Sequence, residues 1–390
     1  MNEIRPPGLM DAADHPALTV LDYADDDARR EDEGDPMAGG HRQKQDKSLL
    51  GVLNALVTRV IPAKDPEFHS PPCVAALKKE LDDLRDQGVW DENGVTEWAS
   101  AKADSIKKGV DATVGRLFAI MGEKGSELRR PVSERVYKAR AVYAGNNIQT
   151  ASGVAAHSLF QEVTQTPAAM MTVRGLLACA ALRGYKPKVR DASQAYIQSR
   201  IDAPGRPKTW IRLPRAWWPR SWYNAAGESL FKDPVVPLCK ALYGHPEAGA
   251  LWDKHLGSIL TDLGWRPVSA HPGLWRHPAT DAFMAVYVDD ILMAAPSAHE
   301  HALWQAIEKR VPFGGPAAPI GKFLGGHHAV TRRGDEVHFE CSMRDFLVDA
   351  VEAYKAELGI ATLPSVRTPY LMEDFVAKKD GEPEIGRAHV

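Results

Sequence analysis

The chain has 390 residues, of which 44% are hydrophobic, so it can bury the core of two or three domains or of one large multi-part fold. It contains no run of roughly 18 apolar residues and no signal-peptide core, so nothing in it predicts a membrane span. Its four cysteines are widely spaced without a C-x-x-C pair, which argues against a zinc site or a disulfide framework and fits a reducing compartment.

Charge is distributed unevenly along the chain, although the formal net charge is only −3. Residues 1–48 carry 12 Asp or Glu against 6 Lys or Arg, and we interpret them as an acidic, disordered linker. Residues 129–220 carry 16 Lys or Arg against 4 Asp or Glu, with tyrosines and tryptophans interleaved. Such a block fits the footprint of a nucleic acid, because bases stack on aromatic rings and basic side chains neutralise phosphates. The alternative is a solvated basic face.

Helical periodicity dominates the segment after the acidic stretch, and we expect residues 49–128 to form a helical lead-in. Apolar residues recur every three or four positions across Pro72–Gln87, which predicts a helix that ends near Gly88. Residues 94–130 are charged and also helix-like.

From Val136 onward the pattern is mixed α/β, without an internal repeat. Short runs of β-branched and aromatic residues predict strands at Ala141–Tyr143, Lys188–Ile197 (with a bend after Asp191), Trp210–Leu213, Val235–Leu238, Phe283–Ala295 (as a hairpin) and Glu336–Phe339. Helical periodicity predicts helices at Val173–Leu182, Pro246–Leu263, Ala298–Arg310 and Met343–Leu358.

Two adjacent acids, Asp289 and Asp290, interrupt the apolar hairpin. Burying unpaired charges costs several kcal/mol per ion, and two acids within about 4 Å repel each other, so a divalent cation is expected to hold both ionised. A third acid, Asp191, follows a separate strand. One acid on one strand and a pair on a hairpin are what a two-metal phosphoryl-transfer site needs. The alternative for the pair alone is an ordinary Asp-Asp turn.

Six short blocks occur in a fixed order along the chain. They are Lys138-Ala-Arg140, Asp191-Ala-Ser-Gln-Ala-Tyr196, Lys240-Ala-Leu-Tyr-Gly244 followed by Trp252, Tyr287-Val-Asp-Asp290, Phe323-Leu-Gly325 and Thr368-Pro369. Through these blocks, roughly residues 70–370 resemble the reverse transcriptase domain of copia-type LTR retrotransposons. The resemblance implies an α+β, right-hand polymerase with palm, fingers and a partial thumb, built on an antiparallel palm sheet.

The resemblance also implies roles for individual residues. The catalytic acids that bind Mg²⁺ or Mn²⁺ would be Asp191, Asp289 and Asp290. Residues implied to bind the incoming nucleotide are Lys138 and Arg140 at the triphosphate, Tyr196 under the sugar, and Tyr243, Gly244 and Tyr287 beside it. Contacts with nucleic acid are predicted for Arg183, Lys186, Lys188, Phe323, Leu324 and Gly325.

Each of these roles has a structural alternative. Tyr196 is otherwise a core aromatic, Lys138 and Arg140 are surface charges, and Tyr243-Gly244 is a helix-entry turn. The chain also departs from the family pattern. Glu247 places an acid near the expected nucleotide site, and residues 311–319 replace a lysine-containing stretch, so no general acid for pyrophosphate can be assigned.

The domain organisation follows from the same resemblance. We expect fingers and palm over residues 129–320, the palm end and a partial thumb over 321–370, and a disordered tail over 371–390. The final Glu384–Val390 reads like a translated sequencing adaptor, so we interpret the tail as an assembly artefact.

The predicted function is RNA-directed DNA polymerisation, with dNTPs and a primed RNA or DNA template as substrates. Other retrotransposon Gag-Pol products are expected partners, a membrane is not, and family analogy predicts a cytoplasmic, particle-associated or nuclear location. The alternatives are an inactive or co-opted fragment that binds nucleic acid without polymerising, and a structural piece of a retroelement particle.

Overall fold

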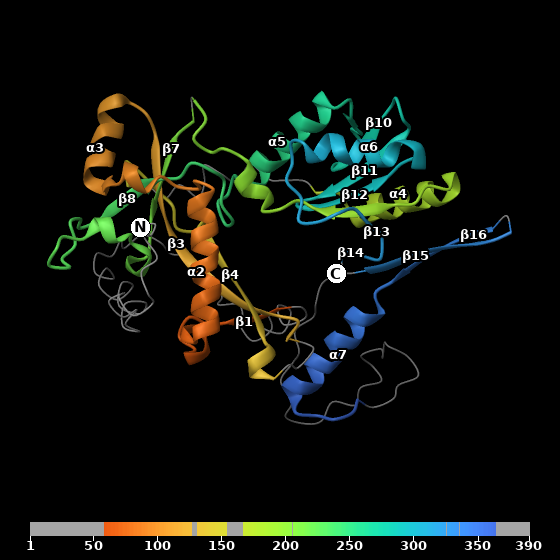
Figure 1. Ribbon diagram of the computed structural model, residues 1–390, viewed down its shortest axis with the longest axis horizontal. Coiled ribbons are helices and arrows are strands. Elements are labelled where there is room, and N and C mark those ends of the chain that lie inside the picture. The colour runs from red at the N-terminus through yellow and green to blue at the C-terminus, as the bar shows by residue number, and fades with distance from the viewer. Residues whose placement is uncertain are drawn as a thin grey trace, which may run out of the picture.

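The computed structural model describes residues 58–126, 131–153, 167–204, 206–324, 326–334 and 336–363. Within these ranges the strands form three sheets, which we call the N-terminal, acid-bearing and C-terminal sheets (Figure 1). The predictions made for residues 1–48, for residues 371–390 and for Gly325 lie outside the described residues.

The N-terminal sheet is organised around one long strand, β3. Its strands are β1 (Thr58–Ile61), β2 (Thr96–Glu97), β3 (Ala112–Lys124), β4 (Val136–Tyr143), β5 (Gln149–Thr150), β7 (Lys208–Arg212) and β8 (Pro234–Pro237). β3 pairs antiparallel with β1, β4 and β5 and parallel with β7. Helix α2 (Pro71–Asp86) covers one face of the sheet and packs Leu81 and Leu84 against Ala141 and Tyr143 of β4.

The helical prediction for residues 94–130 is confirmed only for α3 (Trp98–Lys108). Residues 112–124 are strand β3, because Leu117 and Met121 are buried while Phe118 and Ile120 between them are exposed. This alternation has the two-residue period of a strand, and pairing with β4 satisfies the backbone groups.

The acid-bearing sheet is antiparallel throughout its paired strands. In sheet order these are β13 (Ala318–Pro319), β6 (Lys188–Asp191), β12 (Asp290–Ala294), β11 (Ala282–Tyr287), β10 (Leu274–His277) and β9 (Arg266–Pro267). The mixed α/β class and the hairpin predicted at Phe283–Ala295 are therefore confirmed.

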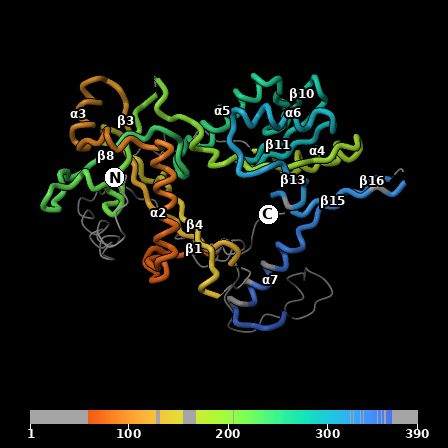
Figure 2. The backbone as a smooth tube through the Cα atoms, in the orientation of Figure 1, coloured from red at the N-terminus to blue at the C-terminus, as the bar shows by residue number. Residues whose placement is uncertain are grey.

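Helices cover both faces of the acid-bearing sheet (Figure 1). They are α4 (Met170–Arg183), α5 (Ala248–Asp262) and α6 (Ser297–Glu308). Met284 and Met293 face α5 and α6, whereas Ala285 and Leu292, one position along each strand, face α4. Burial on both faces explains why these strands are apolar almost without interruption. The chain visits this sheet twice: β6 precedes β7 and β8 of the N-terminal sheet, and α5 then leads back (Figure 2).

The C-terminal sheet consists of β14 (Lys322–Phe323), β15 (Gly326–Arg333) and β16 (Glu336–Ser342), and α7 (Arg344–Leu358) follows it. Short 3-10 helices occur at Pro66–His69, Glu92–Gly94, Val132–Glu134, Ala195–Gln198, Arg215–Trp217 and Arg220–Trp222. No helix in the described ranges has both the length and the apolar character that crossing a membrane requires. All four cysteines are free thiols.

Candidate active site

The turn between β11 and β12 carries the acid pair and has a strained backbone. Tyr287 and Asp290 are the last paired residues, so the loop consists of Val288 and Asp289 alone. Val288 has a φ of 57°, which is rare for a β-branched residue, whereas Asp289 has no positive φ. Positive φ at the first loop residue only is the pattern of a type II′ hairpin turn. The indole Nε1 of buried Trp252 in α5 donates to the Val288 carbonyl at 2.7 Å, so α5 helps to hold the strained turn.

The strand register brings the third acid to this turn. Asp191 at the end of β6 lies directly opposite Asp290 of β12. The backbone N–H of Ala192 donates to the Asp289 carbonyl at 2.8 Å. Directly opposed residues have Cβ atoms about 4.5–5.5 Å apart, and like charges in such a pair destabilise the sheet. Three acids from two distant segments therefore meet at one end of the sheet.

The mutual repulsion of these acids alters their proton affinity. Burial raises the pKa of Asp191, and the charge of Asp289 raises it further, while Lys138 and Arg140 oppose the rise. Burial, followed by the charges of Asp289 and Asp191, raises the pKa of Asp290 to about 6. Within the described residues, no Lys or Arg side chain forms an ion pair with any of the three acids, so no such contact cancels their repulsion.

Partly buried carboxylates that repel one another suit a divalent cation, and hard carboxylate oxygens are the ligands that Mg²⁺ prefers. The charge of Asp289 raises the pKa of Asp191, so these two carboxylates repel each other across the end of the sheet. In the described part of the chain, no three His, Cys, Asp or Glu side chains are yet arranged to enclose a metal ion. The carboxylates themselves fit a divalent ion by their chemistry.

Aromatic side chains border the acids. Tyr196 lies in the 3-10 helix that follows Asp191, and its ring centre is 5.0 Å from that of Tyr243. The Arg140 guanidinium carbon lies 4.6 Å from the centre of the Tyr243 ring. Burial and then the charge of Asp289 raise the pKa of Tyr196, which places its hydroxyl in the field of the acids.

The predicted basic pair faces the same region from strand β4. Ala139 and Ala141 pack into the core on the α2 side, so Lys138 and Arg140 project from the other face of the strand. Burial lowers the pKa of Lys138, the charge of Arg140 lowers it further, and Asp191 acts in the opposite direction. Two cations thus stand across from the acids without neutralising them.

A family profile described as reverse transcriptase (RNA-dependent DNA polymerase) matches residues 127–325, about half of the chain. The chain belongs to the reverse transcriptase family. This confirms the reverse transcriptase prediction made from the motif blocks, and the matched region includes the three acids and the basic pair. The chain is also similar to a transposon Ty5-1 protein of Saccharomyces cerevisiae, with 28% identity over 139 residues. That alignment covers 35% of this chain and 43% of the yeast protein, so the chain matches less than half of that relative's length.

A glycine lies where the segment that carries Tyr243 meets the end of β4. Gly244 has a φ of 85°, and a Cβ atom there would lie 2.2 Å from the Tyr143 carbonyl oxygen. The Tyr143 N–H donates to the Tyr243 carbonyl at 2.7 Å, which joins this segment to the end of β4. Only glycine allows both the backbone conformation and the close approach.

The acid that departs from the family pattern is neutralised. Glu247 forms an ion pair with Arg206 at 2.7 Å, and both side chains are partly buried. The acid that the sequence places near the expected nucleotide site is therefore ion-paired within the described structure.

The residues predicted to contact nucleic acid are not gathered around the acids. Arg183 pairs with Asp281, which precedes β11 and so lies about 20 Å along the strand from the acidic turn. Lys188 pairs with Glu300 at 2.6 Å, while Lys186 is exposed. Phe323 is 3% exposed in the core beside α4, so its ring is not available to a primer strand in this conformation; Leu324 beside it is partly buried.

Sequence reasoning missed the loop that packs against Asp191. The Gly314 N–H donates to the Asp191 carbonyl at 2.9 Å, and a Cβ on Gly314 would lie 3.4 Å from Oδ2 of Asp191. Arg190 holds this loop by donating to the Gly315 carbonyl at 2.9 Å, and it pairs with Glu308 at 2.7 Å. The only signal for this loop in the sequence was the departure of residues 311–319 from the family pattern. That departure indicated the loss of a lysine-containing stretch and gave no indication of a contact with Asp191.

Proposed function

We propose that the chain is the RNA-directed DNA polymerase of a copia-type LTR retrotransposon, which adds dNTPs to a primed RNA or DNA template by two-metal nucleotidyl transfer. The observation that carries this proposal is the convergence of Asp191, Asp289 and Asp290 at one end of an antiparallel sheet, inside the region that matches the reverse transcriptase family. The similarity to a protein named for a yeast transposon supports the retroelement origin.

In the proposed reaction, the 3′ oxygen of the primer forms a bond to the α-phosphorus of the dNTP, and the bond from that phosphorus to pyrophosphate breaks. Asp191 and Asp289 are the proposed ligands of the Mg²⁺ or Mn²⁺ ions, with Asp290 as the third acid. Bound ions would supply charge stabilisation at the attacking and leaving oxygens. The residues of the chain contribute mainly by positioning, as is general for phosphoryl transfer.

Lys138 and Arg140 are proposed to bind the triphosphate. Both lie opposite the acids on β4, so a nucleotide between them would meet cations at its phosphates and carboxylates at its reacting end. The Tyr196 ring, packed 5.0 Å from that of Tyr243, is proposed to lie under the sugar and to exclude a 2′-hydroxyl. The choice of dNTP over NTP would follow from this steric restriction.

The right-hand division of the fold belongs to the same proposal. The acid-bearing sheet would be the palm, the N-terminal sheet the fingers, and the C-terminal sheet with α7 a partial thumb. The template–primer and other Gag-Pol products are the proposed partners, and the cytoplasm, a particle or the nucleus is the proposed location.

Primer extension on an RNA template with dNTPs and either Mg²⁺ or Mn²⁺ tests the proposal. Asp289→Asn should abolish extension, because the amide cannot replace an anionic ligand. Asp281→Asn is the matched control: it removes a carboxylate from the other end of β11, at a φ of 53° that Asn tolerates, and should extend normally. Extension that survives Asp289→Asn would refute the proposal.

The second candidate is a retroelement fragment that binds nucleic acid without polymerising. One observation favours it: residues 311–319 replace the lysine-containing stretch of the family pattern, so no general acid for pyrophosphate can be assigned. Template binding by the unmodified protein, without extension in either metal, would support this candidate and reject the first.

A further inference from the structure

We propose that Glu67 and Glu80 are positioning residues that hold strand β4 so that Lys138 and Arg140 face Asp191. Both glutamates precede residue 127, where the match to the reverse transcriptase family begins. The inference rests on the proposed polymerase function, because it assigns these residues to the triphosphate side of that site.

Strand β4 needs support beyond its one neighbouring strand. It pairs with β3 along its whole length, from Val136 opposite Lys124 to Tyr143 opposite Leu117, and within the described residues its other edge has no strand partner. Lys138 and Arg140 project from the face that α2 does not cover. The position of both side chains therefore depends on the course of β4, which the residues that flank them hold in place.

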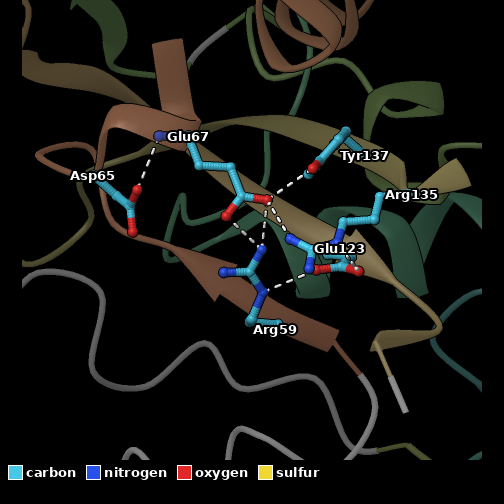
Figure 3. Close-up of polar contacts among 6 residues, drawn as sticks. All are labelled: Arg59, Asp65, Glu67, Glu123, Arg135 and Tyr137. Carbon is cyan, nitrogen blue, oxygen red and sulfur yellow. Dashed lines mark hydrogen bonds and ion pairs between the residues drawn. The ribbon is translucent and has the colours of Figure 1, made fainter. Parts of the chain in front are cut away.

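Glu67 holds the residues just before Lys138. Its Oε1 accepts from the Tyr137 hydroxyl at 2.7 Å and from Nη1 of Arg135 at 3.0 Å (Figure 3). Nη2 of Arg59 in β1 donates to both oxygens of Glu67 at 2.6 Å. The 3-10 helix Pro66–His69 and strand β1 are thereby joined to the start of β4.

A second carboxylate completes this ion network. Glu123 of β3 is 4% exposed, accepts from Nε of Arg59 at 2.9 Å, and lies opposite Tyr137 in the strand register (Figure 3). The hydrogen bond from Arg59 is the main cause that lowers the pKa of Glu67 to about 2, so Glu67 is ionised at any physiological pH. Two acids that share two guanidinium groups fix all the participating side chains, because releasing one would leave a poorly hydrated charge.

Glu80 holds the residue just after Arg140. It lies on α2, is half-buried, and its Oε1 accepts the backbone N–H of Ala141 at 3.3 Å. Burial raises the pKa of Glu80, whereas the charges of Arg140 and then Lys138 lower it, so this carboxylate also lies in the field of both cations. The basic pair is thus bracketed by a glutamate contact on either side along β4.

The test compares Glu67→Gln and Glu80→Leu with Glu92→Gln and Glu92→Leu, using steady-state primer extension over a range of dNTP concentrations. Leucine is used at Glu80 because a glutamine oxygen would still accept the Ala141 N–H. Glu92 is the matched control, because it is ion-paired with Arg85 at 2.8 Å and is 23% exposed, against 21% for Glu67. Each of the first two variants should raise the dNTP KM about tenfold with kcat nearly unchanged, as expected when a charge-assisted phosphate contact is misplaced. An unchanged KM in both, or an equal rise in the matched Glu92 variant, would overturn the proposal.

A second measurement separates failure of this inference from failure of the polymerase proposal. The acylation rate of Lys138 by acetic anhydride, followed by mass spectrometry of the substrate-free protein, needs no polymerase activity. Since Glu80 raises the pKa of Lys138, Glu80→Gln should accelerate acylation, and Glu92→Gln should not. Equal acylation of Lys138 in all the proteins would overturn the assigned role of Glu80.

If Glu67→Gln does not fold, Tyr137→Phe can replace it in the primer-extension test. This variant removes one hydrogen bond from the same network and should raise the dNTP KM less, but in the same direction.

Discussion

Replacing Trp252 with phenylalanine should loosen the turn that presents Asp289. The indole Nε1–H donates to the Val288 carbonyl at 2.7 Å, and Trp252 has no exposed surface. Val288 is a β-branched residue at a φ of 57°, a conformation that costs about 1–3 kcal/mol and persists only when surrounding contacts hold it. Phenylalanine fills most of the same space but has no donor.

The expected loss of stability has two parts. A buried carbonyl left without its partner costs about 1–3 kcal/mol. The smaller ring leaves unfilled space in the core, which adds about 1 kcal/mol. Trp252→Phe should therefore reduce the free energy of unfolding by about 2–4 kcal/mol, and kcat should fall because Asp289 is no longer held in place.

Trp265 supplies the matched control for this change. It is also fully buried in the same core cluster, but its Nε1 has no acceptor among the described residues. Trp265→Phe therefore loses packing without losing a hydrogen bond. Urea unfolding followed by far-UV circular dichroism, together with primer-extension kcat, should show a larger loss for Trp252→Phe in both quantities. Equal losses in stability and kcat for the two variants would refute the role of the indole–carbonyl hydrogen bond.

Three further predictions concern backbone fit and protonation. Gly244→Ala should destabilise the protein by more than about 2 kcal/mol, because the new Cβ would lie 2.2 Å from the Tyr143 carbonyl oxygen. Gly227 is the control, since it has a similar φ of 81° but open space around it. Gly227→Ala should cost only about 1 kcal/mol in the same unfolding assay. The folded-state pKa of Asp290 is raised from 3.8 to about 6, so the stability contributed by this residue falls as pH rises through that window. Mg²⁺ should consequently raise the thermal midpoint of unfolding more at about pH 7.5 than at about pH 5. Equal shifts at the two pH values would contradict the assignment of Asp290 to the metal site. The pKa of Glu67 is lowered from 4.5 to about 2, so its contribution to the free energy of unfolding is complete above pH 4.5 and is lost as pH falls toward 2. The stability difference between the unmodified protein and Glu67→Gln should shrink over that interval. A constant difference would count against the ion network around Glu67.

Most of the elements could be predicted from local patterns. The helix over Pro72–Gln87, the hairpin at Phe283–Ala295 and the helix at Met343–Leu358 all form within one or two residues of the expected bounds. One error was strand β3, because charged residues at its ends resembled a helical surface. Another was the strand predicted at Lys188–Ile197, which ends at Asp191 and is followed by a 3-10 helix at Ala195–Gln198. A strand's period is a weak signal when its partners lie elsewhere in the sequence.

In the candidate site, too, local motifs could be predicted from the sequence, whereas contacts between distant segments could not. The short motifs identified Asp191, Asp289 and Asp290, because adjacent acids in apolar surroundings are unusual enough to indicate chemistry. The motifs could not indicate that Gly314 packs against Asp191 or that Trp252 holds the Val288 carbonyl. Both contacts join segments that have no local reason to meet.

By itself the sequence determined the residue types available for chemistry, the apolar periodicity that makes each helix or strand, and membership of the reverse transcriptase family. Only the tertiary structure decided that Arg206 neutralises Glu247, that Phe323 lies in the core, and that Glu67 and Glu80 flank the basic pair. The physical reason is range: propensity and periodicity act over a few residues, whereas ion pairs, buried hydrogen bonds and backbone close approach depend on groups that only folding brings within a few ångströms.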